Sequence, residues 1–155
     1  MKGNEKVIET LNDLLSDELT AINQYIVHAE MAEDWGYPVL HESAEKRAID
    51  EMKHAEKHIA RILFLEGRPI VSNYKKIYIG EDVPKIYEND RISEQEAIDK
   101  YNAAIKLCAE VGDNGTKEML DAILQDEEDH IDYIESELEK IAQMGLAMYL
   151  TTLTK

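Results

Sequence analysis

The chain has 155 residues, of which 44% are hydrophobic and 32% are charged, a composition typical of a single globular domain rich in amphipathic helix. Its formal net charge of −16 disfavours binding to nucleic acid or to an anionic membrane and favours contact with cations. A single cysteine, Cys108, excludes an internal disulfide and any metal site built from Cys-x-x-Cys pairs. The N-terminus has no apolar signal core and no segment has the ~20 apolar residues of a membrane span, so we expect a cytoplasmic protein.

Apolar side chains recur three and four residues apart over about residues 5–34 and again over about 39–66. This period places them on one face of a helix, so both segments are predicted to be long amphipathic helices. Gly36 and Pro38 break the chain between them, and Gly67 ends the second helix. The two helices are therefore expected to form a hairpin.

Residues 67–83 contain many apolar side chains but lack a helical period, which predicts an ordered, extended connection. Antiparallel neighbours need only about 2 to 8 connecting residues. The 17 residues of this segment, extended at up to ~3.3 Å each, can run the ~42 Å length of the preceding helix. We therefore predict a long crossover that leaves the second and third helices parallel.

A third helix is predicted over about residues 84–111, with Pro84 in its first turn, where a missing N–H is tolerated. The glycine-containing segment 112–115 makes a turn. Thr116 is the predicted N-cap of a fourth helix over about 116–144. Four helices of this length indicate an all-α bundle.

Gly145 interrupts the fourth helix and leaves a short apolar tail, residues 146–153, which is too short to cross a membrane. The tail either folds back on the bundle or packs against other subunits. We favour other subunits, because an exposed apolar segment marks an interaction surface.

The pattern Asp-Glu-x-x-His occurs twice, at Asp50-Glu51-Met52-Lys53-His54 and at Asp126-Glu127-Glu128-Asp129-His130. Residues three apart share one face of a helix, so each copy can direct a carboxylate and an imidazole toward one metal ion. One copy alone arises by chance on a charged helix. Both copies lie among apolar side chains, where a lone carboxylate is costly to bury and a metal ion is a common partner. Carboxylates combined with imidazoles suit iron, manganese or zinc.

Each half of the chain also has a lone glutamate in the apolar face of its first helix, at Glu18 and Glu94. Glu18 precedes Glu51 by 33 residues, and Glu94 precedes Glu127 by the same 33 residues. The chain is therefore an internal repeat of two helical hairpins. The matching spacing also selects Glu94 over its acidic neighbours.

The two halves together predict a di-metal centre of four carboxylates and two imidazoles, a pattern known from di-iron carboxylate bundles. The predicted ligands are Glu18 and His54 for one metal, Glu94 and His130 for the other, and Glu51 and Glu127 as bridges between the two. Metals ~3.5 to 4 Å apart can bind dioxygen or peroxide between them and take part in electron transfer to it. Four carboxylates also balance two divalent cations in charge, which permits a buried site.

Tyr25 and Tyr101 each follow a lone glutamate by seven residues. Together with Tyr133, they are predicted to lie beside the ligands as hydrogen-bonding or electron-transfer groups. Core packing with a satisfied hydroxyl is an equal alternative for each. His58, two turns after Glu51, is expected to be a hydrogen-bonded core histidine.

The chain resembles the bacterioferritin family along essentially its whole length, and the resemblance includes the proposed ligands. The matching stretches are Ala21-Ile22-Asn23-Gln24-Tyr25, Ile49-Asp50-Glu51-Met52-Lys53-His54-Ala55, Arg61-Ile62-Leu63-Phe64-Leu65-Glu66-Gly67, Ile79-Gly80-Glu81-Asp82-Val83 and Asp126-Glu127-Glu128-Asp129-His130-Ile131-Asp132. The resemblance implies a ferritin-like four-helix bundle that oxidises ferrous iron at the six ligands with dioxygen or hydrogen peroxide. It also implies storage of ferric mineral in a cage of 24 subunits, with the tail as the fifth helix that lines the four-fold pores.

The family resemblance further implies a haem b bound between two subunits through one methionine from each, and Met52 matches that methionine. Met52 is adjacent to Glu51, so it points about 100° away from the metal centre on a helix. A ferredoxin is the implied reductant for iron release. Lys46 departs from the pattern, because some members have a histidine there that binds iron with Asp50 on the inner wall of the cage. That relay is not expected here.

Two other functions fit the sequence less well. A di-metal peroxidase or catalase resembling rubrerythrin or manganese catalase is the alternative enzyme, but the chain lacks the cysteine pairs of rubrerythrin, and Met52 and the tail favour the cage. A metal-free helical assembly protein would leave four acidic residues in apolar helix faces without an explanation.

Overall fold

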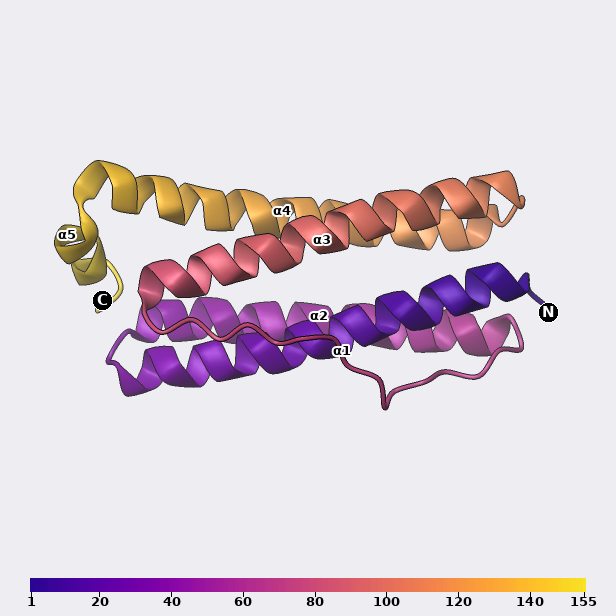
Figure 1. Cartoon of the computed structure of the whole chain (residues 1–155), viewed down its shortest axis with the longest axis horizontal. Coiled ribbons are helices and arrows are strands. Elements are labelled where there is room, and N and C mark those ends of the chain that lie inside the picture. The colour runs from indigo at the N-terminus through magenta and orange to yellow at the C-terminus, as the bar shows by residue number, and fades with distance from the viewer.

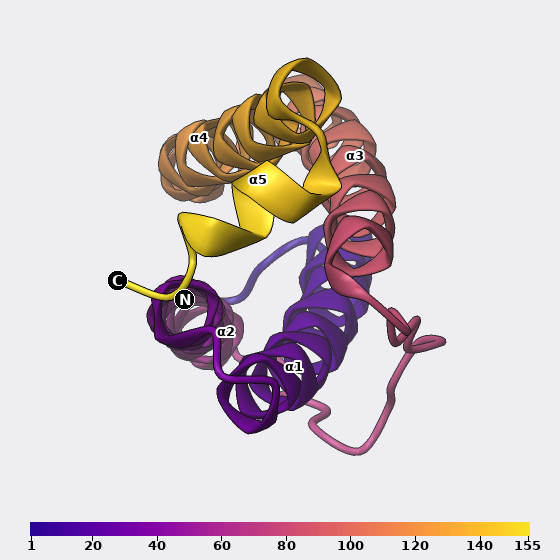
Figure 2. The same cartoon turned by 90° about the vertical axis from the view of Figure 1, so that its left-hand side faces the viewer.

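The computed structural model describes all 155 residues and confirms the predicted all-α fold (Figure 1). Its helices are α1 (Glu5–Asp34), α2 (Pro38–Phe64), α3 (Val83–Glu110), α4 (Asn114–Met144) and α5 (Leu146–Thr151). The four long helices form a bundle, and α5 crosses one end of it (Figure 2). None of the helices has the length and apolar character needed to span a lipid bilayer.

Short polar side chains begin three of the long helices. Asn4 accepts from two backbone N–H groups at the start of α1, and Asp82 accepts from one at the start of α3. The predicted N-cap of α4 was wrong: Asp113, not Thr116, is the cap, and its side chain accepts from both the N–H and the hydroxyl of Thr116. The carboxylate satisfies two donors at once, so α4 begins at Asn114, two residues earlier than expected.

The two helical hairpins are joined by a long crossover. In Figure 1, α1 and α4 run in one direction, whereas α2 and α3 both run in the other. The connection from 65 to 82 extends along the bundle beside α1, as the length argument predicted. The arrangement places a lone-glutamate helix beside each Glu-x-x-His helix.

The crossover is extended but ordered, because polar side chains of α1 bind its backbone N–H groups. Asn12 accepts from Ile70 at 2.9 Å, and Thr20 accepts from Lys75 at 2.7 Å. Further along α1, Gln24 accepts from the N–H of Tyr78, and His28 from that of Gly80. These bonds satisfy backbone groups that have no partner within the segment itself.

Apolar packing occupies the two ends of the bundle and leaves the middle polar. One buried cluster contains Val7, Leu11, Leu14, Leu15, Ala55, Ile62, Leu65, Tyr101, Ala104, Cys108, Leu120 and Ile123. The other, at the opposite end, contains Ala32, Leu40, Val83, Tyr87, Ile134, Tyr149 and Leu153. The predicted ligands lie between the two clusters, so the apolar packing holds the four helices in fixed positions around them.

The C-terminal tail packs on its own bundle, and our preference for other subunits was wrong for its buried face. Tyr149 and Leu153 are 0% and 2% exposed. The Tyr149 hydroxyl donates to Glu137 of α4 and lies 2.8 Å from the Tyr87 hydroxyl of α3. Met148, on the other side of α5, is 59% exposed. The tail therefore has one face on the bundle and one face free.

Candidate metal centre

The structure brings all six predicted ligands together in the middle of the bundle. Each of the four long helices contributes, because the lone glutamates come from α1 and α3 and the two Glu-x-x-His pairs come from α2 and α4. The six side chains are Glu18, Glu51, His54, Glu94, Glu127 and His130, and none is more than 6% exposed. Four carboxylates buried this deeply repel one another unless protons or cations accompany them.

The ligand atoms form two groups that share two carboxylates. Glu18 and His54 belong to one group, Glu94 and His130 belong to the other, and Glu51 and Glu127 belong to both. Within each group, the possible ligand atoms lie within 4.8 Å of one another. The arrangement coincides with the predicted division into terminal and bridging ligands.

Short distances connect the imidazoles to the shared carboxylates. His54 Nδ1 lies 3.0 Å from Glu127 Oε1 and 3.6 Å from Glu18 Oε2. On the other side, His130 Nδ1 lies 3.1 Å from Glu51 Oε1. Both rings direct Nδ1 into the cluster, so this nitrogen is the one available to a metal ion.

The donor set fits two divalent metal ions. Each of the six side chains has one buried nitrogen or oxygen without a hydrogen-bond partner, and these atoms are Glu18 Oε2, Glu51 Oε1, His54 Nδ1, Glu94 Oε2, Glu127 Oε1 and His130 Nδ1. Buried polar atoms without partners are costly, and a coordinated cation supplies the missing partner. Oxygen and imidazole ligands without thiolate suit ferrous iron or manganese.

Two aspartates that the sequence reasoning missed lie beside the outer nitrogens of the histidines, and one of them, Asp126, is within hydrogen-bond distance. His54 Nε2 lies 2.8 Å from Asp126, and His130 Nε2 lies 3.4 Å from Asp50. Each aspartate belongs to the opposite copy of the Asp-Glu-x-x-His pattern. A carboxylate at Nε2 selects the tautomer that carries its proton there and leaves Nδ1 free for a metal. The repeated aspartate was the available signal.

Burial and charge hold protons on two of the carboxyl groups. Desolvation, followed by the charge of Glu51, raises the pKa of Glu18 well above its ordinary value. Desolvation, followed by the charges of Glu51 and Glu94, does the same for Glu127. Desolvation also acts on Glu51, but its interactions with Glu18 and the two histidines outweigh it and lower the pKa of Glu51 well below its usual range. The metal-free cluster therefore shares protons among its carboxyl groups.

The two imidazoles are protonated in the metal-free cluster. Desolvation lowers the pKa of His54, but the carboxylates of Glu18 and Glu51, each 3.6 Å from Nδ1, outweigh it and raise that pKa to about 11. Desolvation likewise opposes the nearby carboxylates of Glu51 and Glu94, which raise the pKa of His130 to about 9. A metal ion must displace these protons when it binds.

Two of the three predicted tyrosines contact the ligands. Tyr25 donates a hydrogen bond to Glu94, and Tyr101 donates one to Glu18. Tyr133 makes no such bond, and its ring lies 5.4 Å from the guanidinium carbon of Arg47. The seven-residue spacing from a lone glutamate therefore identified the contacting tyrosines, whereas sequence proximity to His130 did not.

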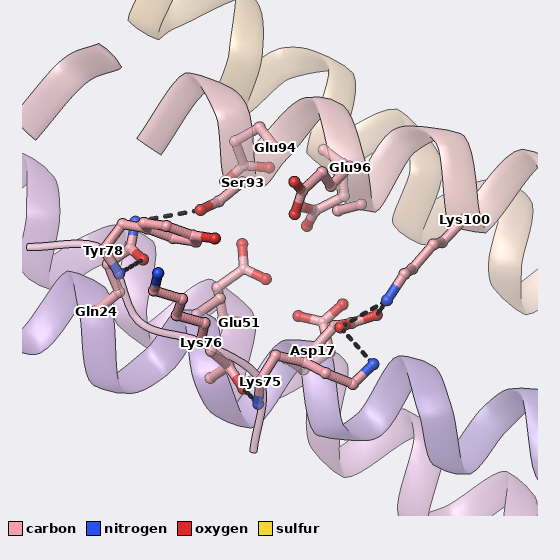
Figure 3. Close-up of a pocket in the computed structure, with 15 residues that line it drawn as sticks. Asp17, Gln24, Glu51, Lys75, Lys76, Tyr78, Ser93, Glu94, Glu96 and Lys100 are labelled. Atoms are coloured by element: carbon pink, nitrogen blue, oxygen red, sulfur yellow. Dashed lines mark hydrogen bonds and ion pairs between the residues drawn. The ribbon is translucent and has the colours of Figure 1, made fainter. Parts of the chain in front are cut away.

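A polar pocket connects the cluster with the surface. It is lined by Glu18, Glu51, Glu94 and Glu127 at its inner end. Figure 3 shows the carboxylates of Glu51 and Glu94 on this pocket, with lysines of the crossover on its outer side. Asp17 accepts from Lys75 at 3.1 Å and from Lys100 at 2.8 Å at the mouth. Small ions and oxidants can therefore reach the ligands between α1 and α3.

Comparison with known proteins agrees with the fold. Residues 8–144 match the family model described as a ferritin-like domain. A bacterioferritin of Brucella melitensis biotype 1 is 41% identical over 149 residues, which cover 96% of this chain and 92% of the relative. A bacterioferritin of Rhodobacter capsulatus is 43% identical over 94% of this chain and 90% of its own, and one of Streptomyces coelicolor is 40% identical over 98% and 91%. With this similarity over nearly its full length, the chain belongs to the bacterioferritin family of ferritin-like proteins.

Proposed function

We propose that the protein stores iron by oxidising ferrous ions at the buried cluster and retaining the ferric product as a mineral. The observation that supports this most directly is the set of six side chains, each with one buried unpartnered donor atom, in two groups that share Glu51 and Glu127. The bacterioferritin relatives support iron as the substrate.

Each proposed ligand has a distinct task. Glu18 and His54 hold one ferrous ion, Glu94 and His130 hold the other, and the shared pair Glu51 and Glu127 bridges them. The four carboxylates neutralise the two divalent ions, so the pair can lie in a buried site. Each ferrous ion gives one electron to dioxygen or hydrogen peroxide, and the product leaves for storage.

The proposed storage form is a homo-oligomeric cage of 24 subunits. An apolar exposed surface on α1 and α2 supports assembly, and it includes Ile26, Ile49, Met52, Leu63 and Phe64, each at least 42% exposed. A surface of this kind marks a protein interface. We place haem b at Met52 on this surface. The proposed reductant for iron release is a ferredoxin. The proposed location is the cytoplasm, where disulfides are rare, and a chain with one cysteine forms no internal disulfide.

Anaerobic titration of metal-free protein with ferrous iron, followed by oxygen and by sedimentation of the same sample, tests the function. We expect ferrous binding to saturate at about two ions per subunit, rapid oxidation, and a cage-sized particle that accumulates ferric mineral. Glu127→Ala removes a carboxylate from both groups and abolishes the rapid phase. Glu128→Ala, at the adjacent exposed position, removes the same charge but retains the rapid phase.

Other results would contradict the proposal. A small oligomer that binds two metal ions but accumulates no mineral would indicate a di-metal peroxidase instead. Absence of stoichiometric binding would reject the metal centre itself. Equal loss of the rapid phase in both variants would place the oxidation elsewhere.

A further inference from the structure

Ion pairs cross the mouth of the polar pocket that leads to the proposed metal centre. Asp17 of α1 accepts from Lys100 of α3 at 2.8 Å and from Lys75 of the crossover at 3.1 Å (Figure 3). Lys75 also donates to Asp13 at 2.7 Å. The Asp17 and Lys100 side chains are 20% and 39% exposed. The network therefore lies where the pocket meets solvent, outside the buried carboxylates.

The lysines oppose the charge of the pocket that they line. The chain has a net charge of −16, so its surface attracts cations. Lys75, Lys76 and Lys100 nevertheless all line the pocket, and a cation on its way to the ligands must pass them. Exposed ion pairs contribute little to stability, and the crossover is already held by backbone N–H bonds to Thr20 and Gln24. Stability of the fold therefore does not account for this group of lysines.

The internal repeat relates the two sides of the pocket. An offset of 76 residues separates the two lone glutamates, and the same offset relates Asp17 to Ser93 and Gln24 to Lys100. These residues meet in equivalent pairs: Lys100 donates to Asp17, and Gln24 donates to Ser93 at 3.3 Å. One contact between α1 and α3 thus closes each side of the pocket, and it is ionic on one side and neutral on the other.

The two contacts differ in how easily they open. Gln24 is 2% exposed, and its amide group also donates to Asp90 at 2.8 Å and accepts from the N–H of Tyr78 at 3.1 Å. Moving this side chain would leave several buried polar groups without partners. Lys100 lies at the surface, where water can replace its contact with Asp17. The ionic side therefore opens at the lower cost.

We infer that Lys100 and Lys75 form a gate that sets the rate at which divalent cations enter and leave the metal centre, an inference that rests on the proposed function. In the closed state, both ammonium groups neutralise Asp17 and place positive charge in the path of the cation. When Lys100 releases Asp17 and turns toward solvent, the repulsion falls and the carboxylate becomes available to the entering ion. The gate changes the rate of passage and leaves the six proposed ligands as they are.

Co²⁺ is a redox-stable probe of this passage, because its visible absorbance changes when protein ligands replace water. Stopped-flow mixing with the metal-free assembled protein measures uptake, and mixing the loaded protein with a chelator measures release. We expect Lys100→Gln to accelerate both at low ionic strength, by at least ~10-fold, with an unchanged number of ions bound. The difference from the unmodified protein should shrink as salt screens the ion pair.

Lys117→Gln is the matched control for the loss of charge. Lys117 is 37% exposed and lies 2.8 Å from Asp121, so it resembles Lys100 in exposure and pairing, but it does not line the pocket. Its replacement should leave both rates unchanged. Ser93→Ala removes the neutral contact on the other side of the pocket and should also leave them unchanged, because Gln24 retains its other bonds.

Lys100→Arg separates the gate from its charge. A guanidinium keeps the positive charge and can bind a carboxylate through two parallel hydrogen bonds, so the closed state should last longer and uptake of Co²⁺ should slow. A rate equal to that of the unmodified protein would show that charge alone acts and would overturn the gate.

Other results would overturn the inference and leave the proposed function intact. They are an unchanged rate in Lys100→Gln, an equal acceleration in Lys117→Gln, and an equal acceleration in Ser93→Ala. Failure of the unmodified protein to bind either Co²⁺ or ferrous iron would overturn the proposed function itself, and the inference with it.

Discussion

The outer nitrogen of each proposed histidine ligand faces an aspartate from the other half of the repeat. Asp126 of α4 faces Nε2 of His54 on α2, and Asp50 of α2 faces Nε2 of His130 on α4. The pair of contacts orients both Nδ1 atoms toward the shared carboxylates. It also links α2 with α4, so the geometry of the centre depends on the docking of the two hairpins.

Replacing Asp126 should weaken metal binding without removing a ligand. Asp126→Asn loses the negative charge that favours the proton on Nε2 of His54. We expect the affinity for the metal ion held by Glu18 and His54 to fall by about 10- to 100-fold. Anaerobic titration with Mn²⁺ as a redox-stable probe measures the change. Asp129→Asn is the matched control, because this exposed aspartate bonds only to Gln125. Equal losses in the two variants would show that net charge, and not orientation of His54, is responsible.

Close backbone packing holds the end of the crossover against α3. A Cβ atom at Gly80 would lie 2.4 Å from the backbone nitrogen of Ile86 in α3 and 2.7 Å from its Cα. The N–H of Gly80 also donates to His28, whose other nitrogen lies 3.0 Å from Asp90. Only glycine allows the end of the crossover to approach α3 this closely.

Gly80→Ala should therefore destabilise the subunit by about 1–3 kcal/mol, because the obstructing atoms belong to a helix backbone and cannot move independently. Urea denaturation of the metal-free protein measures the change. Gly115→Ala is the control: its Cβ would lie 2.7 Å from Arg61 Nη2, but that atom ends a flexible side chain. A loss in Gly115→Ala as large as that in Gly80→Ala would contradict this explanation.

Protons and metal ions compete for the same buried cluster, and this competition affects the stability of the whole protein. The pKa values of His54 and His130 are raised to about 11 and about 9, and those of Glu18 and Glu127 are raised above their ordinary values. The folded state thus binds more protons than the unfolded state above pH 6.5, where an unfolded histidine has lost its proton. These groups stabilise the metal-free protein fully below about pH 6.5. That stabilisation is lost as the pH rises through their pKa values in the folded state.

Metal binding should show the opposite dependence on pH. Between pH 6.5 and about 9 we expect the metal-free protein to become less stable, whereas the added stability from Mn²⁺ grows because fewer protons oppose binding. Thermal unfolding with and without Mn²⁺ at several pH values measures both slopes, and calorimetry in buffers of different ionisation enthalpy measures the protons released. Metal-free protein whose stability rises over this interval would contradict the assignment of protons to the cluster.

Much of the bundle and the candidate centre could be predicted from the sequence alone. Helical period, helix breakers and the length of the crossover determined the four long helices and the parallel arrangement of the second and third. The 33-residue repeat selected Glu18 and Glu94 and grouped them with the Glu-x-x-His pairs. These features depend on spacing along one helix, which the sequence contains directly.

The tertiary structure decided the contacts made between helices. It assigned the cap of α4 to Asp113, seated Tyr149 on its own bundle, and paired His54 with Asp126. It also joined His58 to Tyr101, a pair separated by 43 residues. Helical period shows which face of a helix is buried, but the rotation and register of one helix against another come from side-chain packing across the whole bundle.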